Sequence, residues 1–548
     1  MTRKSGTSLG MNSRTAATSG FNRRQVLAGA VGGGLAISRF GSGQVRAQDE
    51  KQIVVAYAED ILTNDPQRAF EFYSWVIVAN TYDTLVTDTP ENLIDTLPLL
   101  AKSWDIGPDG QTYTFHLDPT AKFASGNPVT AEDVKFSHQR LKNLKDVPGY
   151  YADPWVENIT VIDEHTVQLG LNKPMAYLLP VLTVVPLSIA DSKLIMEQGG
   201  NSNPDADQTD TAKAWLDQHS AGSGPYVLSQ WTPKSGFILE RNPNFWRTPP
   251  YFDRIIGKSV SDPTAQIQLV LSGDAQIAMD VDYDTADEFR DNPDIQIVEK
   301  PSVDLIYMAL NTSPEVSPAL ANKQVRQAIQ YGIDYDGILN GLMRGHGLRP
   351  PSPIVLGMLG ADPEMAVQRD VERAKQFLAD SGVDNVSFPL SYPTNPFGSV
   401  DPAVLAAKIQ ADLAEIGITV ELRPVESGVF STETLSGKLP AFVSLRGPDW
   451  PDASGWAEMF GLHGPEGGFI SNHVNYDKPE LQKLITEAGS TIDQQKREEL
   501  YRQVSQMFID DAVYMPLIQP SRVYIGSPQL KGLTFHPLDI MRFDLLSY

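Results

Sequence analysis

The sequence predicts a mixed α/β protein with more than one lobe. Its 548 residues exceed what a single hydrophobic core ordinarily organises. Residues 371–381 and 403–416 have helical periodicity and alternate with strand-like segments at 387–392 and 418–425. Such alternation of helix and strand predicts a parallel or mixed α/β layer. A composition of 41% apolar and 20% charged residues is typical of a globular chain.

The first 47 residues form a separate segment, which predicts export. This segment has seven basic residues and no acidic one, and its apolar run at 26–38 is too short and glycine-rich for a membrane anchor. Arg23 and Arg24 lie in a sequence that resembles the twin-arginine signal. Small residues just before Gln48 place the predicted cleavage there. A disordered basic tail is the alternative interpretation.

The elements that follow have both strand and helix periods. Residues 52–57 are a β-branched run typical of a strand, and a helix is expected near 70–83. Residues 112–117 alternate apolar and polar side chains, which predicts a half-buried antiparallel strand. Thr130 and Asp133 have the spacing of a capping box and therefore predict the start of a helix.

Further along the chain the pattern continues. A second alternating strand is expected at 165–172, followed by a polar, mobile loop around 200–211. Helices at 479–489 and 494–509 precede an apolar run at 515–525, which we expect to return the chain to the first lobe.

Charge and cysteine content exclude several classes of function. Taking the seven basic residues of the export segment from 44 leaves 37 against 68 acidic residues, a net charge near −31. Such a field opposes binding to nucleic acids and to anionic membranes. The absence of cysteine excludes disulfides, thiol nucleophiles and the lipid-modified cysteine of bacterial lipoproteins. A soluble exported chain is retained where an outer membrane encloses it, so we expect a Gram-negative periplasm.

The sequence contains no recognisable catalytic motif. The eight histidines are scattered without an HExxH pair, and we assign no metal to His463 and His473, ten residues apart. Gly222 and Gly224 lack the lysine of a phosphate-binding loop, and no GxSxG elbow occurs after the export segment. We therefore expect no catalytic residue, no metal and no cofactor. A periplasmic hydrolase of glycosides or peptides is the alternative, because acidic residues could supply a carboxylate pair.

Residues 442–456, FVSLRGPDWPDASGW, concentrate side chains suited to binding. An apolar run breaks at a Gly-Pro pair into a loop that carries Arg446, Asp449, Trp450, Asp452 and Trp456. Two carboxylates, a guanidinium and indole rings in one short loop are typical of a site for a polar ligand. The alternative is a solvated turn whose aspartates cap the following backbone.

Five motifs occur in series along the chain: LLAKSWDIGPDGQTYTFHL, KFASGNPVTAEDVKFSHQRL, GSGPYVLSQW, ILERNPNFW and VRQAIQYGID. In this order they resemble the family-5 extracellular solute-binding proteins, the dipeptide and oligopeptide receptors of ABC importers. The resemblance implies a two-lobed periplasmic binding protein of the large peptide-binding type. Lobe I would comprise 48–309 plus 517–548, with a subdomain inserted at about 88–220, and lobe II would comprise 310–516.

The resemblance also implies how such a protein works. A small-molecule or peptide ligand binds between the lobes, hinge closure buries it, and the closed form docks on an ABC permease in the inner membrane. The chain itself would be a monomer without a membrane anchor and would catalyse no reaction. Peptides, opines, amino-acid conjugates and glycosides all remain conceivable ligands.

Within the loop, the resemblance assigns roles to single residues. In peptide-binding members, a strand of the second lobe ends in a Gly-Trp pair, which is followed by two residues and an Asp. This Asp pairs with the ligand's amino terminus. Asp449 matches this Asp, and Asp452 matches a second Asp three residues further on. Arg446 replaces the tryptophan, which favours ligands with a carboxylate or phosphate. The alternative for Arg446 is an ion pair with Asp449 or Asp452 in the ligand-free protein.

Four further candidates lie outside this loop. Glu59 and Asp60 follow the first strand, where the family's first lobe meets the ligand backbone. Tyr150 and Tyr151, in the aromatic turn PGYYADPW, could close over the ligand. A core or surface position is the alternative for all four.

Overall fold

The computed structural model describes residues 51–548 except 59, 153–154, 465–468 and 539. The predicted export segment, 1–47, and the candidate Glu59 lie outside the described residues. In the described part of the chain, no helix combines the length and the apolar character that crossing a membrane requires.

Strands from both halves of the chain join in one mixed sheet. In the described residues it has 12 strands, with β16, β15, β17, β13, β18, β11, β1, β10, β9 and β8 in this spatial order and with β12 and β14 also pairing with β18. Their bounds are β1 (Gln52–Tyr57), β8 (Tyr226–Thr232), β9 (Gly236–Arg241), β10 (Arg254–Ser259), β11 (Ile277–Ala278), β12 (Gln296–Pro301), β13 (Leu305–Leu310), β14 (Gly347–Leu348), β15 (Ser387–Pro393), β16 (Thr419–Val425), β17 (Ala441–Arg446) and β18 (Tyr514–Gly526).

Two smaller sheets belong to the N-terminal half. The hairpin β2 (Val86–Thr89) and β3 (Asn92–Pro98) stands by itself. A four-stranded antiparallel sheet has the order β4 (Ala101–Ile106), β5 (Thr112–Leu117), β7 (Thr166–Leu171) and β6 (Val156–Asp163).

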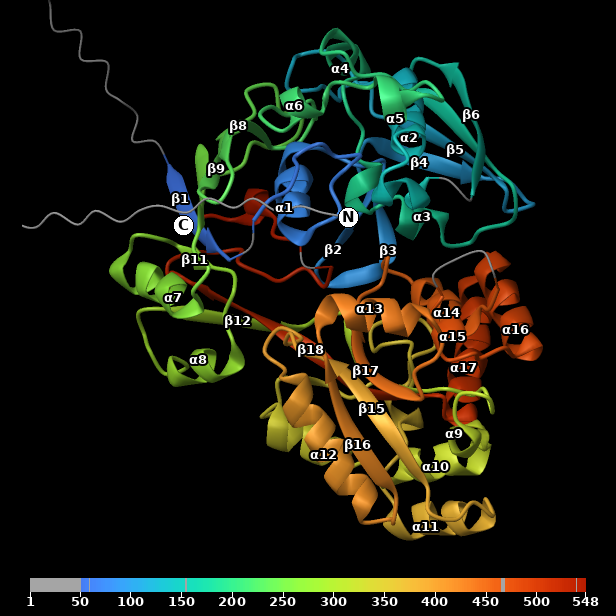
Figure 1. The fold of residues 1–548 in the computed structure, drawn as a ribbon. Helices are drawn as coiled ribbons and strands as arrows, with labels where there is room; N and C mark the ends of the chain where they lie inside the picture. Colours follow the sequence, from blue (N-terminus) through green and yellow to red (C-terminus); the bar gives the residue numbers. More distant parts are fainter. Residues whose placement is uncertain (1–50, 59, 153–154, 465–468, 539) are drawn as a thin grey trace, which may run out of the picture. The chain divides into compact units, whose positions relative to one another are not determined.

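The helices fall into two sets along the chain, before and after β12 (Figure 1). The first set is α1 (Phe72–Thr81), α2 (Ala131–Asn143), the 3₁₀ turns η1 (Val147–Tyr151) and η2 (Val185–Leu187), α3 (Leu178–Val181), α4 (Ser192–Glu197), α5 (Ala206–Thr209), α6 (Lys213–Leu216), α7 (Pro263–Ser272) and α8 (Tyr283–Glu288). The second set is α9 (Pro318–Ala321), α10 (Lys323–Gly332), the π-helix η3 (Gly337–Leu342), the 3₁₀ turns η4 (Pro363–Met365) and η5 (Phe543–Leu545), α11 (Val371–Asp380), α12 (Pro402–Ala414), α13 (Ser427–Leu435), α14 (Ala453–Gly461), α15 (Ile470–His473), α16 (Pro479–Ser490) and α17 (Gln494–Asp511).

Local sequence patterns explain several elements directly. In β5, Tyr113, Phe115 and Leu117 are buried and alternate with half-buried neighbours, which confirms the predicted half-buried strand. The predicted capping box begins α2, because the Asp133 carboxylate accepts from the backbone of Thr130 at 2.9 Å. The expected strand, helix and strand near 387–425 are β15, α12 and β16, and the two strands pair in parallel as such a crossover requires.

The segment 200–211, expected to be a polar, mobile loop, includes one short helix. This segment contains α5, and its end is fixed by charge: the Asp210 carboxylate accepts from the buried Arg140 side chain at 2.8 Å. Arg140 also donates two hydrogen bonds of 2.7 Å to Asp65. A buried guanidinium requires such partners, and the sequence pattern gave no indication that these distant residues would meet.

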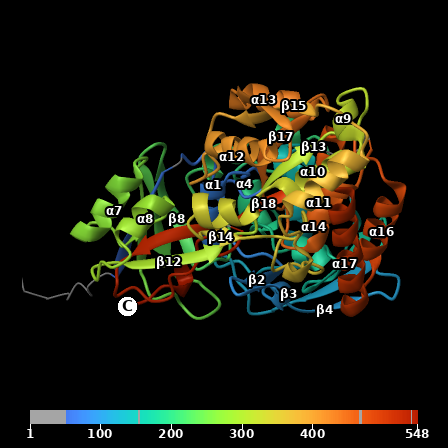
Figure 2. The ribbon, with the colours of Figure 1, turned by 90° about the horizontal axis from the view of Figure 1, so that it is seen from below.

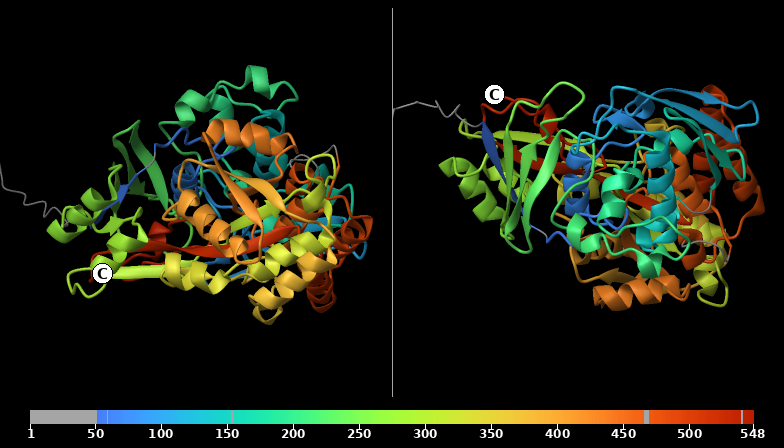
Figure 3. Two further views of the ribbon diagram at one scale, coloured as in Figure 1. Left: turned by 60° about the horizontal axis from the view of Figure 1, so that its bottom comes forward. Right: turned by 90° about the horizontal axis from the view of Figure 1, so that it is seen from above.

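The long strand β18 connects the two halves of the fold. Its first residues pair with β13, and its last residues pair with β11 and β12. Figures 2 and 3 show β12 lying along β18. We call the elements around β1 and the four-stranded sheet the first lobe, and those around β13 and β15–β17 the second lobe. Because β18 belongs to both lobes, it does not mark a boundary between them. The limits of lobe I (48–309 plus 517–548), of its inserted subdomain (88–220) and of lobe II (310–516) remain predictions.

Each lobe has its own hydrophobic cores. Alternate residues of β13 belong to different cores: Ile306 and Met308 face one, and Leu305 and Tyr307 face the other. A strand covered on both faces is apolar throughout, as β13 is. In the first lobe, one core surrounds β1 and another surrounds the four-stranded sheet. The second of these also includes Trp450, which follows β17 of the second lobe.

Candidate functional site

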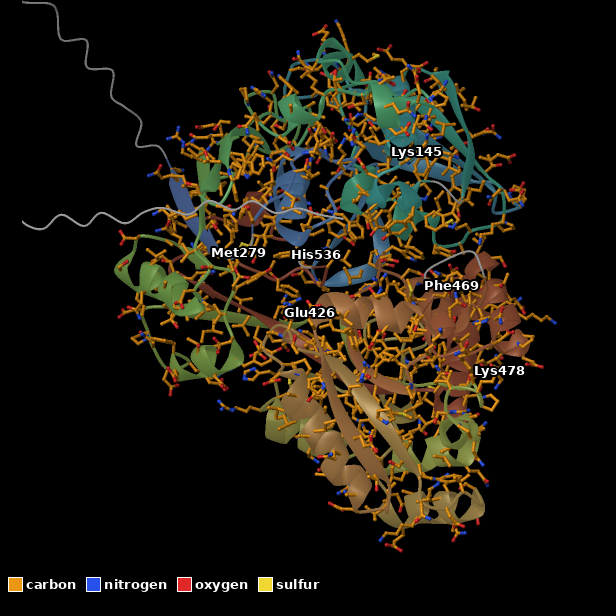
Figure 4. All side chains as sticks on the ribbon, in the orientation of Figure 1. Lys145, Met279, Glu426, Phe469, Lys478 and His536 are labelled. Atoms are coloured by element: carbon orange, nitrogen blue, oxygen red, sulfur yellow. The ribbon has the colours of Figure 1, made fainter. Side chains whose placement is uncertain are left out.

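A cavity of about 920 Å³ lies between side chains of the two lobes. The first lobe contributes residues near α1, η1 and α3, and the second lobe contributes β13, β17, α13, α14 and α15. The lining residues are Phe70, Tyr150, Trp155, Lys173, Tyr307, Phe430, Ser431, Thr434, Leu435, Ser444, Leu445, Arg446, Asp449, Trp450, Gly455, Glu458, Met459, Leu462, Phe469, Ile470 and His473. Figure 4 labels Phe469 at the start of α15. A cavity of this size, with apolar walls and few charges, is typical of a ligand site.

The end of β17 forms one wall of this cavity. Ala441, Phe442 and Val443 are buried in the sheet, whereas Ser444, Leu445 and Arg446 are partly exposed and line the cavity. β17 pairs with β13 along its whole length, so the partly exposed end of the strand is still held in the sheet. The loop 447–452 then connects β17 to α14.

Arg446 and Asp449 form an ion pair on this wall. The Arg446 guanidinium donates to the Asp449 carboxylate at 2.6 Å. Burial alone would lower the pKa of Arg446, but the Asp449 carboxylate and the neighbouring hydroxyls of Tyr150, Tyr307 and Tyr151 together outweigh this effect, so the pKa is raised. Both residues also line the cavity. The ion pair considered as the alternative from the sequence is therefore present, and Arg446 faces the cavity as well.

Trp450 lines the cavity and also joins the lobes. Only 5% of its surface is exposed. Its indole stacks on Tyr177, with ring centroids 5.7 Å apart, and meets Trp155 edge to face at 5.3 Å. Its Nε1–H donates to the Ser454 hydroxyl at 2.8 Å. Trp450 therefore packs the second-lobe loop into the first-lobe core while one part of its ring faces the cavity.

Tyr150 and Tyr151 end η1 opposite this loop. Their rings stack with centroids 4.2 Å apart. Tyr150 lines the cavity, and Tyr151 is buried behind it. Burial raises the pKa of both hydroxyls, and the Asp449 carboxylate adds to the effect. The structure thus brings together Tyr150, Asp449, Arg446 and Trp450 from the residues that the sequence predicted.

Asp452 lies outside this group, and so does Trp456, which is buried on α14 and not in the loop. The Asp452 carboxylate caps α14 by accepting from the Ser454 backbone at 2.8 Å, and it forms a buried ion pair with Arg497 of α17. The structure therefore gives Asp452 the capping position that the sequence left as an alternative. It lines a separate cavity of about 490 Å³ together with Arg497.

Asp60 also lies apart from the large cavity. Its carboxylate accepts from the backbone N–H groups of Ile61 at 3.1 Å and Lys234 at 2.9 Å, and it is not among the described lining residues. These bonds connect the loop after β1 to the β8–β9 hairpin. The neighbouring candidate, Glu59, is outside the described residues.

Sequence reasoning missed several polar residues of the cavity. Glu458 on α14 accepts from the Tyr177 hydroxyl, and burial raises its pKa despite this bond. Burial and the nearby Arg446 lower the pKa of His473, which favours its neutral form. Lys173 lies exposed at the cavity wall. A helical stripe at Gly455, Glu458, Met459 and Leu462 faces the cavity, and its i, i+3, i+4, i+7 spacing could have indicated this face.

The described residues contain no cluster of three or more His, Asp or Glu side chains arranged to hold a metal ion. His473 lies at the cavity wall beside aromatic and aliphatic neighbours. The cavity can therefore offer a ligand apolar surface, aromatic rings, two cations and two carboxyl groups.

Comparison with known families gives a match over most of the chain. The family described as "Bacterial extracellular solute-binding proteins, family 5 Middle" matches residues 95–468. Among curated proteins, a probable D,D-dipeptide-binding periplasmic protein of Escherichia coli K12 is 29% identical over 497 residues, which are 90% of this chain and 93% of that protein.

Solved structures have the same fold. HbpA2 of Haemophilus parasuis aligns with a TM-score of 0.79 at 22% identity and covers 90% of this chain and 99% of its own. The periplasmic binding protein DppA of Helicobacter pylori, in complex with the peptide STSA, aligns with a TM-score of 0.70 at 24% identity, covering 92% and 99%. These alignments confirm the mixed α/β, two-lobed fold predicted from the sequence.

Proposed function

The chain belongs to the family-5 bacterial extracellular solute-binding proteins, and we propose that it captures a peptide or peptide-like solute and delivers it to an ABC-type permease. The cavity between the lobes is the proposed binding site. Four residues that the sequence predicted to contact the ligand line this cavity: Asp449, Arg446, Trp450 and Tyr150. The name of the E. coli relative, a probable D,D-dipeptide-binding protein, supports a ligand with peptide character.

One observation carries this proposal: the cavity has walls from both lobes. Phe70, Tyr150 and Lys173 come from the first lobe, and Phe430 and Arg446 come from the second. A ligand that fills such a cavity contacts both lobes at once, so its binding free energy favours the arrangement in which they are close together. This is the property that a receptor needs if the permease is to distinguish its loaded form.

We further propose that the chain has no catalytic activity of its own. The family consists of solute-binding proteins, and the comparisons give no support to the periplasmic hydrolase considered from the sequence. The cavity's two carboxyl groups are each engaged by a neighbour, Asp449 by Arg446 and Glu458 by Tyr177. Neither is therefore poised as a free general base.

Export and retention complete the proposal. The E. coli relative is named as a periplasmic protein, which supports a periplasmic location here. Twin-arginine export through Arg23 and Arg24, cleavage before Gln48, a Gram-negative host and a monomeric state all rest on the sequence. Export of a variant with Arg23→Lys and Arg24→Lys tests the route, because accumulation of precursor in the cytoplasm is expected.

The binding function is tested by native mass spectrometry of protein purified from its own periplasm. A retained solute of defined mass, displaced by added peptides, is the expected result. Small-angle scattering should then show a smaller radius of gyration with saturating peptide than without it. A chain that binds no peptide and hydrolyses one instead would contradict the proposal.

A further inference from the structure

The cavity's hydrogen-bonding groups are unevenly matched, and this imbalance bears on the ligand class. Both acids already have protein partners: Asp449 accepts from Arg446 at 2.6 Å, and Glu458 accepts from the Tyr177 hydroxyl. Asp449 keeps a second oxygen, but the Arg446 guanidinium beside it offsets the carboxylate's charge and repels a second cation. A ligand ammonium group therefore gains less at Asp449 than it would at an unpaired carboxylate.

The cations, in contrast, have unused donors. Within the part of the chain that the structure describes, Lys173 forms no ion pair, and Arg446, whose side chain is 37% exposed, bonds Asp449 through one of its nitrogen atoms. A ligand that supplies an acceptor to the remaining donors gains a charge-assisted hydrogen bond. A carboxylate is the natural acceptor for both a guanidinium and an ammonium group.

Apolar surface forms most of the remaining wall. The rim includes two large apolar side chains that stay in water without a ligand: Phe70 is 39% exposed and Leu435 is 66% exposed. Between them lie aromatic and aliphatic side chains from both lobes. Covering such surface is favourable by roughly 25 cal/mol for each Å² removed from water. The cavity therefore suits a ligand with a substantial apolar body.

From these observations we infer that the ligand has an apolar body and a free carboxylate but no free α-ammonium group, as in N-acylated amino acids and N-acylated dipeptides. This inference rests on the proposed binding function and specifies its ligand. It differs from the role suggested by the family resemblance, in which Asp449 receives an amino terminus. Here Asp449 instead holds Arg446 in place, and Lys173 and Arg446 face the ligand's carboxylate.

A panel of apolar dipeptides with altered ends tests the inference. Each sequence is prepared as the free dipeptide, the N-acetyl dipeptide, the dipeptide amide and the N-acetyl dipeptide amide, and binding to the full mature chain is measured by calorimetry. The N-acetyl acid should bind at least about tenfold more tightly than either the free dipeptide or the N-acetyl amide, which corresponds to at least about 1.4 kcal/mol.

Variants assign the carboxylate contact. Lys173→Met should reduce the preference for the N-acetyl acid over its amide several-fold, whereas Lys483→Met, an exposed change on α16, should leave the preference unaltered. Free dipeptides that bind as tightly as their acetylated forms would overturn the inference and leave the peptide-binding function intact. Failure of every form to bind would overturn both.

Discussion

The indole of Trp450 lies almost parallel to the ring of Tyr177, with 5.7 Å between centroids and 9° between planes. Trp450 comes from the loop after β17 and Tyr177 from the segment just before α3, so this stack joins the second lobe to the first. The neighbouring Tyr177 hydroxyl donates to Glu458, also of the second lobe. The two lobes are thus held together beside the cavity by an aromatic contact and a hydrogen bond.

Trp450→Ala should weaken this junction. Truncating a buried tryptophan ordinarily lowers the free energy of unfolding by about 3–5 kcal/mol. We expect a loss near the lower end, because one part of the ring faces the cavity, together with weaker ligand binding. Urea denaturation and calorimetry measure the two effects. Trp450→Phe keeps an aromatic ring, so its free energy of unfolding should fall by only about 1 kcal/mol, for the lost hydrogen bond to Ser454. Equal decreases in the two variants would show that ring stacking does not stabilise the junction.

Asp452→Ala should destabilise the fold more than it affects ligand recognition. It removes the cap of α14 and leaves Arg497 buried without its partner. Breaking a buried ion pair from one side costs about 3–5 kcal/mol. Asp493 provides a matched control, because it caps α17 from an exposed position and Asp493→Ala should cost only about 1 kcal/mol.

Both urea midpoints and ligand affinities are measured for the pair. If the Asp452 variant retained its stability but lost the ligand, Asp452 would be a binding residue after all. The double variant Asp452→Asn with Arg497→Met removes both charges and should recover part of the lost stability.

The elements of this fold could be predicted because their signals are local. Alternation in 112–117, the capping box at Thr130 and Asp133 and the helix–strand alternation near 371–425 depend on neighbouring residues, and each appears as expected. The burial of Arg140 against Asp65 and Asp210 is set by residues 70 and more positions apart. No local pattern contains that information, so the ordered segment near 206 was predicted as a loop.

In the candidate site, too, local sequence features could be predicted and contacts between distant residues could not. The loop 447–452 stood out in the sequence because its charges and indoles do not suit a core, and it does reach the cavity. Its internal roles depend on partners elsewhere: Asp452 meets Arg497, and Trp450 meets Tyr177. Lys173 has no distinctive neighbours in the sequence, whereas Glu458 could have been found from the helical spacing of Gly455, Glu458, Met459 and Leu462.

Arg446→Met should change which ligands the cavity prefers. It frees the Asp449 carboxylate, which can then accept a hydrogen bond from a ligand ammonium group. A charge-assisted bond contributes about 1.5–3 kcal/mol, so free dipeptides should gain at least about tenfold in affinity relative to N-acetyl dipeptides. Arg446→Lys keeps the positive charge and should retain the original order. Calorimetry with one dipeptide, free and N-acetylated, measures the two affinities. If Arg446→Met still bound the N-acetyl form more tightly, Asp449 would not discriminate between a free and an acetylated amino end.

His138 should make the fold sensitive to acid. It is buried on α2, its Nδ1–H donates to the Val134 carbonyl at 3.2 Å, and its Nε2 has no partner among the described residues. Burial lowers the pKa of His138 to about 4, well below its ordinary value. The unfolded chain therefore binds a proton more readily than the folded one, and stability is lost as the pH falls from about 6.5 towards about 4.

Replacing this ring isolates its contribution from that of the many carboxylates. His138→Met cannot take up the proton, so between about pH 7.5 and about pH 4.5 its free energy of unfolding should fall by about 2–3 kcal/mol less than that of the unaltered protein. His219 is exposed, and His219→Met should follow the unaltered protein across the same range. Urea denaturation at both pH values measures the difference. Parallel decreases for His138→Met and the unaltered chain would mean that the ring takes up its proton at the same pH in the folded and the unfolded state, which would contradict the prediction.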